Sequence, residues 1–136
     1  MKFLVAIHRP VGFDHAETLD ESVRQNIDAV NDEMVAAGVR LFVGGLKSQA
    51  SATSIRLGAD QSTLVTDGPF LDAKEFVDGF WVLECASQDE AVEWGRKAAL
   101  ACRGSVEVRA SCADGLYRLE VEDTGPGIDS GTPPAA

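Results

Sequence analysis

Residues 18–38 read TLDESVRQNIDAVNDEMVAAG, a pattern typical of one amphipathic helix. Thr18 and Glu21 have the spacing of a capping box, in which the hydroxyl and the carboxylate bind free backbone amides at the start of a helix. Gly38 is suited to the left-handed residue that follows the end of a helix. Between them, apolar residues recur at three- and four-residue steps and form one face, which contains Leu19, Val23, Ile27, Val30 and Met34. We therefore predict a helix from Leu19 to Ala37.

Strands are predicted on both sides of this helix. Residues 3–7 (FLVAI) are apolar without interruption, as in a central strand that is covered on both faces. A polar loop over residues 9–17 then leads into the helix. Stretches rich in β-branched and aromatic residues, bounded by turn residues, predict further strands at 39–46, 53–57, 62–66, 79–85 and 105–109.

A second helix is predicted from the capping-box spacing of Ser87 and Glu90 to about Cys102, ended by Gly104. Small residues on its inner face would let it approach a sheet closely. The resulting order, β-α-β-(β-hairpin)-β-α-β, is that of the split βαβ, ferredoxin-like α+β fold. Two helices can cover only one face of such a sheet, so we expect a homodimer in which the other faces pack together.

Composition and charge indicate one soluble, acidic domain. The chain has 136 residues, of which 45% are hydrophobic and 25% charged, an average globular composition. Its net charge of −10 argues against a nucleic-acid partner and against an anionic membrane surface. The apolar run at residues 3–7 is too short for a signal peptide or a membrane span, so we expect a cytoplasmic protein.

We divide the chain into a domain at residues 1–110 and a C-terminal extension at residues 111–136. In the extension, residues 116–121 could add one strand, and the Gly/Pro-rich remainder is expected to be disordered. The cysteines are odd in number and lack a C-x-x-C spacing, so we expect them to be reduced and to pack as small hydrophobic residues. They are Cys85, Cys102 and Cys112.

An unusual run of residues lies between positions 67 and 81. Asp67-Gly68-Pro69-Phe70 forces a tight reversal, because Gly tolerates a positive φ and Pro fixes φ. The Asp67 carboxylate either caps its own turn or stands at the mouth of a cleft as a proton acceptor or ligand anchor. In the second interpretation, Lys74 is the cation for an anionic substrate group. The predicted ligand-binding residues are Gly68, Pro69, Phe70, Lys74, Glu75 and Trp81.

The same stretch, Asp67-Gly68-Pro69-Phe70 followed by Lys74-Glu75 and Gly79-Phe80-Trp81, resembles the signature of the DGPF-domain, YCII-related protein family. The resemblance covers residues 1–110. It implies a dimeric α+β barrel, in which two ferredoxin-like sheets pack face to face. It also implies a family largely without assigned biochemistry, some members of which are encoded beside extracytoplasmic-function sigma factors.

In the wider superfamily, a His–Asp pair in the cleft between subunits has been proposed as an acid–base site, and the resemblance implies that Asp67 is its aspartate. Those relatives carry the histidine on the first helix, whereas the helix predicted here contains none. The histidines are His8, at the end of the first strand, and His15, in the following loop. We take His8 as the candidate catalytic partner of Asp67 and expect His15 to be solvated. Their spacing makes a poor metal site, and we expect no cofactor.

Two hypotheses about function follow. In the first, the protein binds a small molecule in a cleft of the dimer, with acid–base chemistry at Asp67 and His8. In the second, it is a non-catalytic regulatory or interaction dimer that works with a sigma factor, and residues 67–70 are only a structural turn. A His8 side chain within hydrogen-bonding reach of Asp67 would favour the enzyme. A His8 packed inside the sheet on backbone partners would contradict that version.

Overall fold

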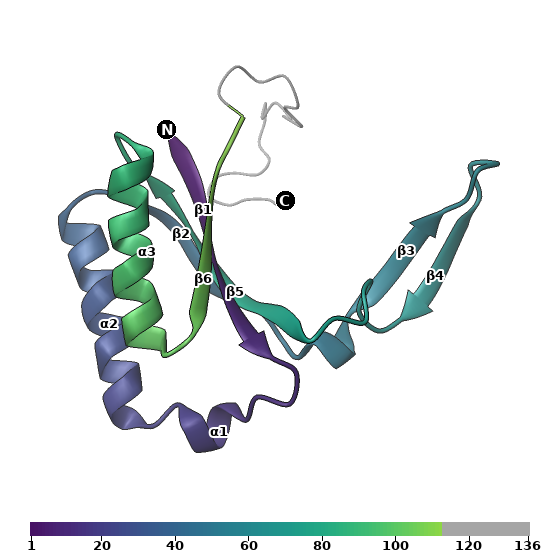
Figure 1. Cartoon of the computed structure of the whole chain (residues 1–136), viewed down its shortest axis with the longest axis horizontal. Coiled ribbons are helices and arrows are strands. Elements are labelled where there is room, and N and C mark those ends of the chain that lie inside the picture. Colours follow the sequence, from purple (N-terminus) through teal and green to yellow (C-terminus); the bar gives the residue numbers. More distant parts are fainter. Residues whose placement is uncertain (113–136) are drawn as a thin grey trace.

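The computed structural model describes residues 1–112 (Figure 1). In chain order, its elements are β1 (Lys2–Pro10), α1 (His15–Thr18), α2 (Glu21–Ala36), β2 (Arg40–Gly45), the 3-10 turn η1 (Gln49–Ser51), β3 (Thr53–Leu57), β4 (Thr63–Asp67), β5 (Glu75–Glu84), α3 (Gln88–Cys102) and β6 (Ser105–Ala110). The strand predicted at residues 116–121 and the disorder predicted beyond it lie outside the described residues.

Four strands form one antiparallel sheet in the order β2-β5-β1-β6. Helices α2 and α3 lie side by side on one of its faces (Figure 1). This arrangement confirms the predicted ferredoxin-like α+β fold. Among residues 1–112, strands β3 and β4 pair only with each other, and their hairpin projects away from the main sheet (Figure 1).

The core lies between the sheet and the two helices. Alternate residues of β1 and β5 point to this side, because successive side chains of a strand face opposite ways. Gly95 of α3 faces β6, and a Cβ atom there would lie 2.9 Å from Val108 Cγ2. The small residues of α3 thus allow close packing on the sheet, as predicted. The largest fully buried side chains are Trp81, Phe3, Met34, Leu83, Val5 and Val23.

The predicted start of the first long helix is wrong by two residues. Thr18 ends the short helix α1, and Asp20 is the N-cap of α2, since its carboxylate accepts a hydrogen bond from the Val23 amide at 3.0 Å. Both Thr and Asp are good caps, and the capping-box spacing selected Thr18 for the prediction. Gly38, with φ +73°, follows the helix as predicted.

The capping box of α3 is confirmed. The Ser87 hydroxyl accepts a hydrogen bond from the Glu90 amide, and the Glu90 carboxylate accepts one from the Ala86 amide. The left-handed residue at the end of this helix is Arg103, with φ +54°, and not Gly104. A Cβ atom on Gly104 would lie 2.9 Å from Nη1 of Arg9, so this glycine makes room for a side chain from β1.

Strands β1 and β5 pair over a longer stretch than their apolar runs predict. Ile7 lies opposite Gly79 and His8 lies opposite Val77, so the register shifts and Asp78 has no partner residue in β1. Beyond this bulge, pairing continues to Pro10 and Glu75. The extended pairing brings polar residues of both strands to one end of the sheet.

Two of the three cysteines behave as predicted. Cys85 and Cys102 are buried, Cys112 is exposed, and all three are free thiols. Burial raises the pKa of the Cys102 thiol to about 11, so this thiol is protonated and unreactive at neutral pH. Within residues 1–112, each helix is too short or too polar to pass through a lipid bilayer.

Candidate functional site

The loop of residues 67–70 is fastened to strand β3. Gly68 has φ +111°, which only glycine adopts without strain. Its amide donates a hydrogen bond to the Ala52 carbonyl, and its carbonyl accepts one from the Ser54 hydroxyl, each at 2.7 Å. Arg56 donates to the Phe70 carbonyl at 2.9 Å, and its guanidinium carbon lies 4.2 Å from the centre of the Phe70 ring. The loop is therefore held in place through its backbone.

Asp67, the candidate base, is the last residue of β4 and is exposed. Among residues 1–112, no hydrogen bond or ion pair joins its carboxylate to a partner, nor does any hydrogen bond join it to His8. The His8 Nε2 atom is shielded from solvent without a hydrogen bond, and it lies 3.7 Å from a carboxylate oxygen of Glu107. The structure does not assemble Asp67 and His8 into a hydrogen-bonded pair, so their catalytic roles stay predictions.

Trp81 is a core residue. Its side chain is 2% exposed, and its indole N–H donates a hydrogen bond to Asn31 Oδ1 at 2.9 Å, on α2. Lys74 is exposed in the loop before β5, and its carbonyl accepts a hydrogen bond from the Val11 amide. The two predicted ligand-binding residues are therefore in different surroundings: Trp81 lies in the core beneath α2, and Lys74 lies at the surface.

A cluster that the sequence did not predict lies at the bulge. His15 Nε2 is 2.8 Å and 2.9 Å from the two carboxylate oxygens of Asp78. Arg9 Nε donates to the same carboxylate at 3.3 Å, and Arg9 Nη1 donates to the carbonyls of Cys102 and Arg103 at 2.8 Å and 3.1 Å. Arg9 is 3% exposed. Thus the buried Arg9 guanidinium binds two carbonyls at the end of α3 and the Asp78 carboxylate. The same carboxylate binds His15.

Aromatic packing also orients His15. The edge of its ring meets Phe13 with ring centres 4.9 Å apart, and the Arg9 guanidinium lies 4.3 Å from the centre of the same Phe13 ring. His15 itself is about half exposed, whereas Asp78 is mostly buried. Since a neutral imidazole donates from one nitrogen and accepts at the other, an Nε2–H bound to Asp78 leaves Nδ1 as the acceptor.

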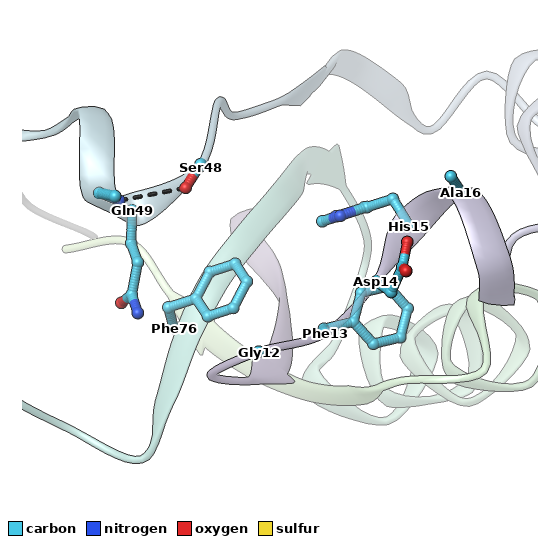
Figure 2. Close-up of a pocket in the computed structure, with 9 residues that line it drawn as sticks. Gly12, Phe13, Asp14, His15, Ala16, Ser48, Gln49 and Phe76 are labelled. Carbon is cyan, nitrogen blue, oxygen red and sulfur yellow. Dashed lines mark hydrogen bonds between the residues drawn. The ribbon is translucent and has the colours of Figure 1, made fainter.

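His15 stands on the wall of a hollow of about 570 Å³, which we call the His15 hollow. Figure 2 shows Phe13, Asp14 and His15 on one side of it, Ser48 and Gln49 on the other, and Phe76 of β5 between them. The polar side chains from two distant segments therefore face a common space.

A second hollow of about 640 Å³, which we call the Phe70 hollow, adjoins the first. Both are lined by Ser48, Gln49 and Phe76. Of the predicted ligand-binding residues, Pro69, Phe70 and Glu75 line the Phe70 hollow; Gly68, Lys74 and Trp81 do not. Its other lining residues are Leu46, Lys47, Ser51, Ala52, Leu71, Ala73 and Val77.

One signal in the sequence could have pointed to Asp78. It is the only charged residue in the stretch 76–83, FVDGFWVL, and a charged residue in such an apolar strand usually has a buried partner. Its partners, however, are Arg9 and His15, which lie more than 60 positions away in the chain. Their meeting depends on the pairing of β1 with β5.

Comparison with known proteins places residues 1–111 in one family. The model of the YCII-related domain matches residues 1–111. The chain is also similar to the uncharacterized protein R00369 of Rhizobium meliloti (strain 1021), with 39% identity over 92 residues, which cover 66% of this chain and 73% of that protein. The resemblance inferred from residues 67–81 is therefore confirmed.

Proposed function

Since the chain belongs to the YCII-related family, whose uncharacterized relative supplies no activity, we propose from the geometry that it binds a small molecule at the His15 hollow and performs acid–base chemistry there. The observation that supports this proposal is the contact of His15 Nε2 with both oxygens of Asp78, on the wall of a hollow. A histidine oriented by a carboxylate is a common arrangement for a general base.

In the proposed reaction step, neutral His15 donates its Nε2–H to Asp78 and accepts a proton from the ligand at Nδ1. The imidazolium formed is stabilised by the Asp78 carboxylate. Arg9 acts as a positioning residue, because its contacts with Asp78 and with two carbonyls of α3 fix the carboxylate in place. Returning the proton from Nδ1 to another atom of the ligand would complete an isomerisation. In an elimination, the bond between the ligand and its leaving group would break, and the leaving group would take this proton.

We also propose that a second copy of the chain covers the open face of the sheet. Leu4 and Phe42 are large apolar residues that stay at least 41% exposed there. Phe42 stacks on Phe80 with ring centres 5.6 Å apart, which gives the face a continuous apolar centre. Exposed apolar patches of this kind are typical of interfaces, and α2 and α3 occupy only the opposite face.

The experiment that tests the proposed site screens wild-type protein by thermal shift and by NMR of labelled histidine rings against small weak acids such as phenols, enols and ketones. A compound that binds only the folded protein stabilises it by about 2.7 kcal/mol at a hundredfold excess over Kd. We expect this stabilisation to be lost in His15→Gln and to be kept in His8→Gln, the matched histidine control.

Two other outcomes would contradict the proposed site at His15. Binding that survives His15→Gln but is lost in Asp67→Asn or His8→Gln would assign the site to the residues predicted from the sequence. If no compound binds, the observations would favour the second hypothesis, a non-catalytic regulatory or interaction dimer linked to a sigma factor.

A further inference from the structure

We infer that the ligand is amphipathic, with an apolar body in the Phe70 hollow and a neutral, weakly acidic hydroxyl group at His15. The inference rests on the proposed acid–base role of His15 and adds the chemical class of the ligand. It is drawn from the wall that the two hollows share, from the apolar lining of the Phe70 hollow, and from the charges around the His15 hollow.

The two hollows share part of their walls. Both are lined by Ser48, Gln49 and Phe76. Figure 2 shows the Phe76 ring between Gln49 on one side and Phe13, Asp14 and His15 on the other. The volumes, about 570 Å³ and about 640 Å³, are each within the range of small-molecule sites. An elongated molecule that lies along Phe76 would therefore contact the linings of both.

The Phe70 hollow favours an apolar occupant. Four of its large hydrophobic residues remain at least 38% exposed, namely Leu46, Phe70, Leu71 and Val77. Scattered exposed apolar residues are ordinary, but a group gathered around one hollow is typical of a binding site. The charged residues in its lining are Lys47 and Glu75, which have opposite signs and so provide no net charge to attract an ion.

The charges around the His15 hollow disfavour an anionic head group. Asp14 lines this hollow, and its carboxylate caps α1 by accepting a hydrogen bond from the Glu17 amide. Asp78 lies behind the His15 ring. Arg9 is buried, and its guanidinium already binds Asp78 and the carbonyls of Cys102 and Arg103. None of the residues that line this hollow in the described chain is Lys or Arg. A carboxylate or phosphate would be repelled, whereas a hydroxyl can donate to Nδ1 without a charge partner.

The test uses a series of 4-alkylphenols with side chains of increasing length, titrated into the full chain and followed by NMR of labelled histidine rings. Each buried methylene should lower Kd about fourfold, and the His15 ring signals should shift. The matching 4-alkylanisoles, which lack the hydroxyl proton, and the 4-alkylbenzoates, which are anionic, should bind at least about tenfold more weakly.

Two exposed leucines give a matched pair of variants. Leu71 lines the Phe70 hollow and is 65% exposed, whereas Leu57 of β3 is 75% exposed and lines neither hollow. Both positions tolerate a polar residue without loss of the core. Leu71→Ser should weaken the dependence of Kd on chain length, and Leu57→Ser should leave it unchanged.

The outcomes separate this inference from the proposed function. If phenols move the His15 signals but longer chains bind no better, the amphipathic class is wrong and the acid–base site stands. Tighter binding of the benzoates would likewise overturn only the inferred class. If longer chains bind better but equally well to His15→Gln, or if no probe reaches His15, both proposals fail.

Discussion

Replacing Asp78 by asparagine tests the structural basis of the site directly. Asp78→Asn keeps the shape of the side chain but removes its charge. Arg9, which is 3% exposed, would then face a neutral amide, although it would keep its hydrogen bonds to the carbonyls of Cys102 and Arg103. His15 would lose the carboxylate that accepts its Nε2–H. The expected result is a less stable protein with a less ordered His15 ring.

The magnitude follows from the burial of the pair. Removing one partner of a fully buried ion pair costs about 3–5 kcal/mol. Here the cost is lower, because Asp78 is 14% exposed and Arg9 retains two carbonyl acceptors. We therefore expect a loss of about 2–3 kcal/mol in the free energy of unfolding. For a domain of this size, that loss lowers Tm by about 8–12 °C.

The assay is urea unfolding followed by tryptophan fluorescence, since Trp81 is buried in the native core. His15→Gln should cost less than about 1 kcal/mol, because a hydrogen bond from a half-exposed side chain contributes little. Combining it with Asp78→Asn in a double-mutant cycle isolates the coupling between the two residues. Asp67→Asn serves as the control, with an expected change within about 0.5 kcal/mol. If Asp78→Asn were as stable as this control, the assignment of Asp78 as the partner of Arg9 would be refuted.

The remaining predictions address the dimer interface, the packing of the core and two properties of the cysteines. Phe42→Asp should convert a dimer into a particle of the 14.4 kDa chain mass in sedimentation, whereas Leu100→Asp, at a still more exposed position on α3, should leave the dimer intact. Gly95→Ala should cost about 1–3 kcal/mol in urea unfolding, because its Cβ would lie 2.9 Å from a β6 valine. Burial raises the pKa of Cys102 from 9.0 to about 11, so the unfolded chain loses this proton first, and stability should decline as pH rises from about 9 to 11; Cys102→Ala should remove this decline. At pH 8, iodoacetamide should label Cys112 in the native protein and Cys102 only after unfolding, as mass spectrometry would show.

The order of elements was predictable because each helix and strand leaves a local pattern. The residues of α2 expected on its apolar face include Val23, Val30 and Met34, and these three are buried. The boundaries were less predictable. Thr18 and Asp20 can both cap a helix, and the choice between them depends on the short helix α1 that precedes α2.

Local patterns along the chain were enough to predict the α+β order, the two-helix layer, the tight turn at Gly68 and the family, because spacing, capping and glycine conformation act over a few neighbouring residues. Which polar residues meet depends instead on the folded arrangement. A one-residue shift in the pairing of β1 with β5 leaves Asp78 without a partner in the ladder, and its carboxylate binds Arg9 and His15. No local pattern records this contact, because it depends on the register of two strands that lie far apart in the chain.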